Sequence, residues 1–285
     1  MYMSMFDLMK LKKKKLKIGL ALGGGGARGF SHVGAIKAFE EYGLDFDYVC
    51  GTSAGSLVGA FYSAGYSFQQ IYDIAKTIKT NDIRTSKVIF VPSKTEGIEN
   101  VIKTHLGDIN IEDLKKPFSA VAVDMKTTKE IVITKGNLAK AIAGSCCVPA
   151  VFQPVEFEGM LLCDGGLQNT LPADIPKLMG CDYVVGIDVN KSRTYGTDSS
   201  KLIDIISCTI RILMKSNVVK GYENSDVLLK PETKRFKSTS TEGYLDMIEE
   251  GYREAIDKMP EILKLFQGKA PRKKIKLETD NMEIF

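Results

Sequence analysis

The sequence predicts an α/β fold in which a largely parallel sheet is covered by helices. Two observations lead to this prediction. Short apolar runs alternate with longer segments of helical periodicity through most of the 285 residues. In addition, both glycine-rich turns lie between a predicted strand and a predicted helix, as in consecutive strand–helix units. The length is sufficient for one large α/β domain or two small ones, and no internal repeat is visible.

In the first half of the chain, each predicted element has its own signal. Lys17–Leu22 and Asp47–Cys50 are short apolar runs that predict buried strands. Ser31–Tyr42 carries apolar side chains at helical spacing and ends at Gly43, a helix stop. Small residues favour a helix over Ala54–Ala64, and helical spacing predicts further helices over residues 67–79 and 95–106.

The second half continues the alternation. Apolar and polar residues alternate in Pro117–Val123 and Lys129–Thr134, which predicts two strands joined near Met125 and Lys126. Pro260 is expected to break the last helix or to start a new one. The polar segment 191–201 predicts a surface loop. Further strands are predicted at residues 161–163, 183–189 and 226–230, and helices at 137–147, 172–179, 202–219 and 244–266.

Composition argues against several classes of protein. Hydrophobic residues make up 44% and charged residues 26% of the chain, as in ordinary globular proteins. A net charge of +4 gives no argument for a nucleic-acid partner, and no apolar run is long enough to span a bilayer. With two histidines and no Cys-x-x-Cys pair, we expect no metal and no cofactor. The six cysteines lie in apolar runs, which favours reduced thiols and a cytoplasmic location.

We divide the chain into a basic N-terminal tail (1–17), a main domain (18–266) and a charged C-terminal tail (267–285). The first segment lacks the arrangement of charges, apolar core and cleavage site of a secretory signal peptide. Basic residues at 10–17 and 269–276 are compatible with peripheral contact to an anionic membrane surface, although solvated tails are the preferred interpretation. The sequence does not reveal the oligomeric state.

The glycine-rich loop Gly23–Gly29 follows the first predicted strand. Without side chains, its N–H groups can point into open space at a helix N-terminus and bind an anion. That anion is either a dinucleotide pyrophosphate, since the loop fits Gly-x-Gly-x-x-Gly, or the oxyanion of a tetrahedral acyl intermediate. The acids that a dinucleotide site would need, Asp45 and Asp47, precede the second strand instead of following it. The oxyanion is therefore the preferred interpretation.

A Gly-x-Ser-x-Gly turn, centred on Ser53, lies where the second strand meets a helix. Such a turn exposes the serine Oγ over the end of a sheet, at the positive end of the helix, so Ser53 is a candidate nucleophile. No histidine follows His105, so the usual order of serine, acid and histidine is not preferred. His32 could lie near the site but is interpreted as a polar residue at a helix start.

Asp164 is the remaining candidate base. It follows an apolar strand and precedes Gly165 and Gly166, which places a carboxylate at a strand end on a tight turn. A carboxyl group with a pKa of about 4 is a weak base at pH 7, but burial raises such a pKa and an oxyanion hole supplies further catalysis. Taken alone, the motif is better interpreted as a common Asp-Gly turn without chemistry, but taken with the other two motifs it is not.

Together, three blocks resemble the patatin-like phospholipases in the family's order: Gly24–Gly29, Gly51–Gly55 and Asp164–Gly166. Ser145–Phe152 and Gly166–Pro172 are also similar to the family. The resemblance covers residues 18–186 and implies a three-layer α/β/α sandwich, with a patatin-like acyl hydrolase domain over 18–266. Gly166 stands where plant members carry alanine, a form common in bacterial relatives, so the chain looks like a compact bacterial-type member.

The resemblance implies a serine acyl hydrolase with a Ser–Asp dyad, which cleaves fatty-acyl esters of phospholipids or lysophospholipids through an acyl-enzyme. No metal or cofactor is implied. The alternatives are a serine esterase or thioesterase acting on other esters, a non-catalytic lipid-binding protein and, least favoured, a dinucleotide-binding protein. The implied roles are nucleophile for Ser53, base for Asp164, oxyanion hole for Gly24, Gly25 and Gly26, loop support for Arg28 and Gly29, nucleophile elbow for Gly51 and Gly55, and dyad turn for Gly165 and Gly166.

Overall fold

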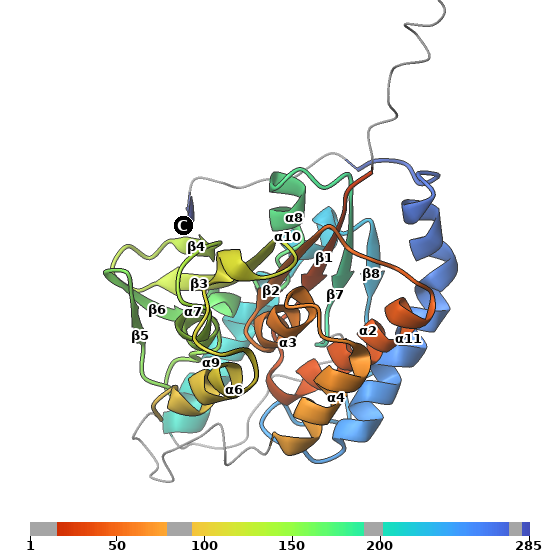
Figure 1. The fold of residues 1–285 in the computed structure, drawn as a ribbon. Helices are drawn as coiled ribbons and strands as arrows, with labels where there is room; N and C mark the ends of the chain where they lie inside the picture. Colours follow the sequence, from red (N-terminus) through yellow and green to blue (C-terminus); the bar gives the residue numbers. More distant parts are fainter. Residues whose placement is uncertain (1–15, 79–92, 191–201, 274–280) are drawn as a thin grey trace, which may run out of the picture.

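The computed structural model describes residues 16–78, 93–190, 202–273 and 281–285, and in these residues a nine-stranded mixed sheet lies between layers of helices (Figure 1). Five strands run parallel and are hydrogen-bonded in the order β3, β2, β1, β7, β8. This confirms the predicted α/β class and the largely parallel sheet. Their bounds are β1 Ile18–Leu22, β2 Tyr48–Thr52, β3 Phe118–Asp124, β7 Tyr183–Ile187 and β8 Val227–Leu229.

The remaining strands extend the sheet beyond β3. β4 (Glu130–Ile133) and β6 (Met160–Asp164) are antiparallel to β3, and β5 (Val155–Phe157) is antiparallel to β6. β9 (Met282–Ile284), which lies in the predicted C-terminal tail, pairs in parallel with β4. Neither β5 nor β9 was predicted, since each is only three residues long.

The register of β3 brings two strand ends together. β4 pairs with Ala120–Val123 along one side of β3. On the other side, β2 pairs as far as Val121 and β6 pairs from Ala122 onward. Because β2 is parallel and β6 antiparallel to β3, their carboxyl ends meet there, opposite neighbouring residues of one strand. Neighbouring residues of a strand are about 3.4 Å apart along its axis.

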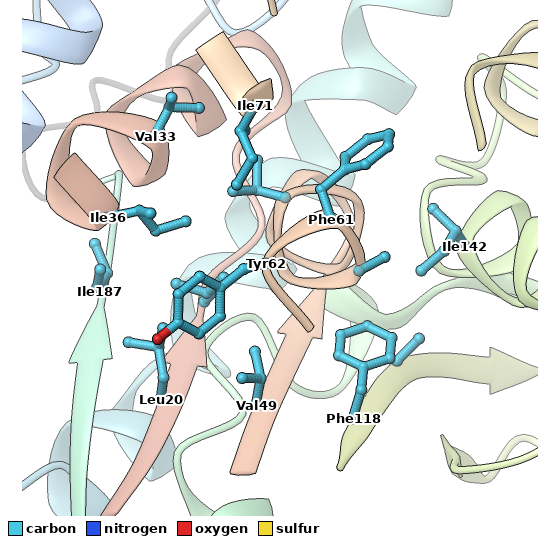
Figure 2. Close-up of a cluster of buried hydrophobic side chains, with 14 of the residues drawn as sticks. Leu20, Val33, Ile36, Val49, Phe61, Tyr62, Ile71, Phe118, Ile142 and Ile187 are labelled. Atoms are coloured by element: carbon cyan, nitrogen blue, oxygen red, sulfur yellow. The ribbon is translucent and has the colours of Figure 1, made fainter. Parts of the chain in front are cut away.

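Helices cover both faces of the sheet. The larger core lies beneath α2, α3, α7 and α11, and Figure 2 shows part of it, with Leu20 and Val49 of the sheet facing Ile36 and Tyr62. α8 and α10 pack on the opposite face. The helices are α2 Phe30–Glu41, α3 Ala54–Ser63, α4 Phe68–Thr77, α6 Glu96–Leu106, α7 Leu138–Ser145, α8 Asp174–Leu178, α9 Leu202–Ser216, α10 Val219–Asn224 and α11 Tyr244–Phe266.

Two predicted helices differ from those observed. α11 continues through Pro260, because Met259 and Ile262 stay buried on the same face as the residues before the proline. The prediction of a break there was wrong. The segment predicted as one helix over 202–219 instead ends at Ser216, and α10 begins at Val219. The predicted loop 191–201 and residues 1–15 of the N-terminal tail lie outside the described residues.

Candidate active site

Ser53 lies at the junction of β2 and α3 with a strained backbone. Its φ of 52° and ψ of −126° are rare for a residue with a side chain, and such strain is often found at functional sites. Its N–H donates to Ser145 Oγ over 2.9 Å, and the Ser145 hydroxyl donates to the carbonyl of Val121 over 2.6 Å. Ser145 therefore ties the turn to β3.

The two glycines of this turn are required by close packing. A Cβ on Gly51 would lie 2.5 Å from backbone atoms of Gly55, inside any normal contact distance. A Cβ on Gly55 would lie 2.0 Å from the carbonyl oxygen of Leu22 at the end of β1. Side chains at these positions would push α3 away from the sheet, so the predicted elbow residues have a packing role here.

Asp164 ends β6 and is completely buried, with 0% of its surface exposed. Its Oδ1 accepts from the N–H of Gly166 over 2.8 Å, and its own N–H donates to the carbonyl of Cys147 over 3.0 Å. A Cβ on Gly165 would lie 2.2 Å from the carbonyl oxygen of Val121, so the turn passes directly over β3. Thr52 pairs with Val121 and Asp164 with Ala122, which places Ser53 and Asp164 at the same point of the sheet.

Both residues open onto one apolar cavity of about 310 Å³. Its wall contains Ser53, Asp164 and Gly24–Gly26. The rest is formed mainly by aliphatic and aromatic side chains, three of which, Val33, Phe61 and Ile71, are labelled in Figure 2. Part of the wall comes from the Ser145–Phe152 stretch, which resembled the family in sequence: Cys146, Val148, Pro149, Val151 and Phe152.

The glycine loop lies beside the serine turn. A Cβ on Gly24 would be 3.2 Å from Ser53 Cβ. The Gly24 N–H, however, donates to the carbonyl of Thr170 over 2.9 Å, so it does not fit the predicted role of an oxyanion donor. Within the described parts of the chain, the N–H groups of Gly25 and Gly26 have no hydrogen-bond acceptor, and both residues line the cavity.

Arg28 holds this loop from behind. The side chain is only 9% exposed, and its Nε and Nη2 donate to the carbonyl of Phe236 over 2.9 and 2.7 Å. Its Nη1 contacts Asn190 Oδ1 at 3.5 Å, and the Asn190 amide in turn donates to the carbonyl of Gly24. Gly29 packs on α3, since a Cβ there would lie 2.6 Å from that of Ala54. These contacts are those expected of residues that support the loop.

Neither histidine is placed to act on Ser53. His32 is fully buried in α2, and its Nε2 lies 2.8 Å from the carbonyl oxygen of Gly23. Burial lowers the pKa of His32 to about 4, so the ring is neutral near pH 7 and its Nε2–H donates to that carbonyl. His105 lies exposed on α6 and does not line the cavity.

The acids considered for a dinucleotide site lie at the opposite edge of the sheet. Asp47 Oδ2 accepts from the N–H of Ile18 at the amino end of β1, and Asp45 pairs with Lys116. The glycine loop follows the carboxyl end of β1. These acids therefore cannot reach a ribose bound at that loop, which argues against the dinucleotide alternative.

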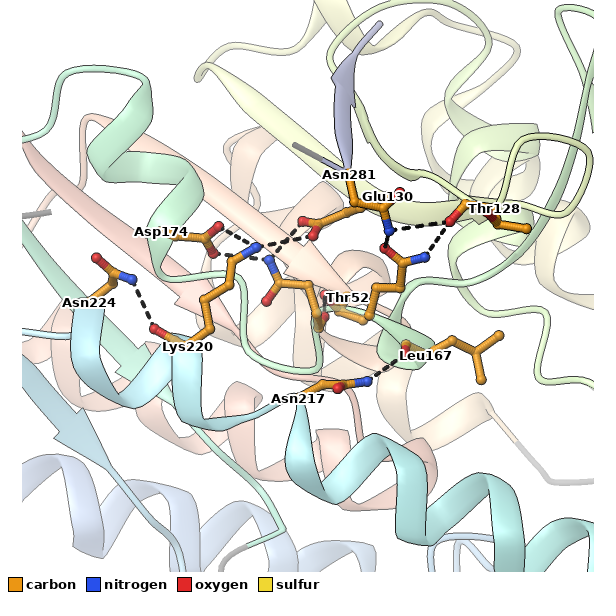
Figure 3. Close-up of polar contacts among 11 residues, drawn as sticks. Thr52, Thr128, Glu130, Leu167, Asp174, Asn217, Lys220, Asn224 and Asn281 are labelled. Carbon is orange, nitrogen blue, oxygen red and sulfur yellow. Dashed lines mark hydrogen bonds and ion pairs between the residues drawn. The ribbon is translucent and has the colours of Figure 1, made fainter. Parts of the chain in front are cut away.

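Next to Thr52, the residue before Ser53, lies a buried charged network, shown in Figure 3, that the sequence did not predict. Lys220 Nζ contacts Glu130 Oε2 at 3.1 Å and Asp174 Oδ2 at 2.8 Å. The Asn169 amide donates to both carboxylates over 2.8 and 2.9 Å, and the Asn169 carbonyl accepts from Thr52 Oγ1 over 2.8 Å. The network thus joins the residue before Ser53 to the segment that follows the Asp164 turn.

Electrostatics in this network follow from burial and charge balance. Burial raises the pKa of the Glu130 carboxyl above its usual value. Burial alone would lower the pKa of Lys220, but the attraction of Asp174 and Glu130 outweighs it, and the pKa is raised. Lys220 is therefore held as a cation between two carboxylates. Of the residues in this network, Asn169 is the one that the sequence could have indicated, because it lies in the stretch Gly166–Pro172 that is similar to the family.

The cysteines are all buried and free, with no disulfide between them. Burial raises the pKa of Cys146 well above its usual value and that of Cys147 to about 12, so neither is a thiolate near pH 7. Among the residues that the structure describes, no group of three metal-ligating side chains is found. No helix in that same part of the chain combines the length and the apolar character needed to cross a bilayer.

Comparison with known proteins gives relatives for part of the chain. An uncharacterised NTE family protein of Mycobacterium tuberculosis is 33% identical over 183 residues, which are 62% of this chain and 50% of that protein. Patatin-like phospholipase domain-containing protein 6 of Homo sapiens is 36% identical over 198 residues, 64% of this chain and 14% of that protein. The chain therefore spans about half the length of the mycobacterial relative and much less of the human one.

Among solved structures, VipD from Legionella pneumophila is similar in fold. Its TM-score is 0.51 at 14% sequence identity, and the match covers 89% of this chain and 67% of VipD. The family model described as patatin-like phospholipase matches residues 20–177, more than half of the 285-residue chain. The matched region contains the glycine loop, Ser53 and Asp164. The chain belongs to the patatin-like phospholipase family.

Proposed function

We propose that this protein is a serine acyl hydrolase that cleaves fatty-acyl ester bonds of phospholipids or lysophospholipids. Ser53 is the nucleophile and Asp164 the general base. The observation that carries the proposal is the convergence of a strained serine, a buried aspartate and two available loop N–H groups on one apolar cavity. Such a set of groups is what acyl transfer requires.

The reaction follows from these positions. Ser53 Oγ attacks the ester carbonyl carbon while Asp164 takes the hydroxyl proton. The N–H groups of Gly25 and Gly26 stabilise the oxyanion of the tetrahedral intermediate. The intermediate collapses, and the leaving alcohol takes the proton from Asp164. Water then attacks the acyl-enzyme, Asp164 accepts its proton, and the fatty acid leaves as Ser53 regains a proton.

The wall of the cavity favours a long acyl chain over a small polar ester. Besides the proposed catalytic groups, the cavity is lined by apolar side chains of α3, α4 and α6, including Leu57, Ile74 and Ile98. Apolar walls of this kind bury a hydrocarbon chain and leave few polar groups unpaired. A thioesterase or an esterase acting on other lipids would use the same groups. The cavity therefore supports an acyl-chain substrate, and the group esterified to that chain is identified by the substrate measurement below.

Labelling with a fluorophosphonate probe tests the nucleophile. We expect labelling of the parent and of Ser63→Ala, which removes another buried serine from α3, but none of Ser53→Ala. Asp164→Asn should label far more slowly, and His32→Gln should label normally. Labelling of folded Ser53→Ala, or its loss in folded His32→Gln, would falsify the dyad.

The substrate class needs a second measurement. The parent and Ser53→Ala are compared on phosphatidylcholine, lysophosphatidylcholine and a short-chain nitrophenyl ester, with the released fatty acid or alcohol measured. We expect higher kcat/KM on a long-chain lipid, because the apolar cavity binds the acyl chain. Turnover of only the short ester would favour the esterase alternative, and no turnover by a protein that labels normally would argue against the lipid substrates.

A further inference from the structure

Helix α9, cyan in Figure 1, is apolar on two of its faces. On the inner face, Ile210 and Met214 line the catalytic cavity. The outer face is exposed to solvent, with exposed fractions of 46% for Ile205, 38% for Ile206, 55% for Ile212 and 54% for Leu213. The spacing i, i+1, i+7 and i+8 places these four side chains in one stripe along the helix. We call them the α9 stripe.

This stripe is the main concentration of exposed apolar surface in the described residues. Nine large hydrophobic side chains there are strongly exposed, and four of them form the α9 stripe. A fifth, Val219, follows at the start of α10 and is 55% exposed. Scattered exposed apolar residues are ordinary, but a contiguous patch on one helix indicates a surface that binds a partner.

Exposed basic side chains lie close in sequence to residues that line the cavity. The segment 238–241 lines the cavity through Ser238, Thr239 and Thr241. Lys237, directly before it, and Lys234 are exposed, and Lys215 is exposed in the last turn of α9. An apolar helix face with a lysine in its last turn, and with two further lysines next to the cavity-lining segment 238–241, is complementary to a surface that offers both hydrocarbon and negative charge.

We propose that the α9 stripe docks on the surface of an anionic phospholipid bilayer. The helix then lies in the interface with its stripe among the acyl chains, while Ile210 and Met214 continue the apolar path into the cavity. The proposal rests on the proposed function for its biological sense, but docking does not require catalysis.

The test measures binding to vesicles in a Ser53→Ala background, where lipid hydrolysis cannot interfere. Vesicles contain phosphatidylglycerol and phosphatidylcholine in equal parts, and binding is followed by co-sedimentation with the full chain. We expect the double variant Ile212→Ser/Leu213→Ser to bind at least about tenfold more weakly. The control is Tyr42→Ser, which removes a side chain that is 48% exposed at the far end of α2, and it should bind normally.

The outcomes separate docking from the hydrolase assignment. Unchanged binding by the folded double variant, or no binding by its parent, overturns the proposal. A change in sedimentation velocity without a change in vesicle binding would mean that a second copy covers the stripe, and also overturns it. In protein that retains Ser53, the double variant should hydrolyse a short-chain ester normally but vesicle lipid slowly. If the double variant loses vesicle binding but the protein that retains Ser53 hydrolyses no ester, docking is supported and the hydrolase assignment is contradicted.

Discussion

Gly25 and Gly26 are the residues on which the proposed oxyanion hole depends, and each is glycine for a different reason. Gly25 has a φ of −177°, outside the left-handed region, but a Cβ there would lie 2.3 Å from Val189 Cγ2. Gly26 has a φ of +58°, and a Cβ would lie 2.3 Å from the carbonyl oxygen of Ser238. The position of the loop is therefore fixed by Val189, just beyond the end of β7, and by Ser238.

Gly25→Ala should reduce kcat without unfolding the protein. The added methyl group forces the loop away from Val189 and moves its N–H groups, and loss of one oxyanion donor typically costs about 10²–10³ in rate. Gly107→Ala is the control, because a Cβ there meets nothing within 4 Å, although its φ is +82°. It should cost about 1–3 kcal/mol of stability, because its φ of 82° and ψ of −171° lie in a region that glycine adopts almost alone, and it should leave kcat unchanged. Full activity of folded Gly25→Ala would argue against this oxyanion hole.

His32 should make stability depend on pH. Its pKa is about 4 in the folded protein and about 6.5 when unfolded, so the unfolded state binds the proton more readily between these values. The free energy of unfolding should therefore fall by roughly 3 kcal/mol as pH drops from 6.5 to 4. Urea unfolding at several pH values checks this. The loss should be smaller in His32→Gln, and an identical pH dependence would contradict the assignment.

Sequence patterns predicted the proposed reacting groups but not the residues that position them. Ser53 and Asp164 lie in motifs that are local in sequence, so their spacing in the chain predicts their role. Ser145, Asn169 and Thr170 act through bonds to residues distant in sequence. Those partners depend on strand register, which no local sequence pattern contains. For the same reason, the hydrogen bond from the Gly24 N–H to the Thr170 carbonyl could not be predicted.

At the scale of elements, α11 shows how packing overrides a local signal. Pro260 lacks an N–H for the carbonyl of Ile256, and proline inside a helix is normally strongly destabilising. The helix stays continuous because Met259, Ile262 and Leu265 extend the buried face beyond the proline. β5 and β9 show the converse case, since tertiary pairing makes strands out of segments too short to have a pattern of their own.

Pro260→Ala should stabilise the protein. Pro260 is exposed, so alanine leaves no cavity, and it restores the backbone hydrogen bond of the helix. We expect the free energy of unfolding to rise by about 1–3 kcal/mol. Asp257→Ala, at an exposed position one turn earlier, should change it by less than about 0.7 kcal/mol. Denaturant unfolding of both variants decides, and a destabilised Pro260→Ala would mean that the proline relieves a constraint elsewhere.

Lys220 joins three elements, α10, α8 and β4, and its removal should be costly. Lys220→Met leaves two buried carboxylates without their cation, which typically costs about 3–5 kcal/mol. The deficit should shrink as pH falls, because protonation of Glu130 removes one unpaired charge, and Glu130→Gln should restore part of the stability. Lys103→Met, at an ion pair 42% exposed on its lysine side, should cost less than about 1 kcal/mol. Equal costs for both lysines would contradict this account.

Within the described residues, no short stretch of chain contains the whole site. The cavity is lined by residues from Gly24 to Thr241, and the proposed dyad is positioned by β2, β3 and β6 together. We therefore expect esterase activity to be lost at the same urea concentration as helical circular dichroism, or earlier. Activity that persists after the helical signal has disappeared would show that part of the fold is sufficient.

The meeting of β2 and β6 on one side of β3 also bears on how chains of this family can change in length. The distance between Ser53 and Asp164 is set by the spacing of neighbouring residues in β3. It does not depend on the length of the connections that lead to either residue. Extra residues near Gly159, where a Cβ would meet nothing within 4 Å, leave the two groups in place. One extra residue between Val121 and Ala122 would move them apart and turn every later side chain of the strand to the opposite face. Insertions and deletions accumulated during evolution should therefore collect in the connections, while β3 keeps its length.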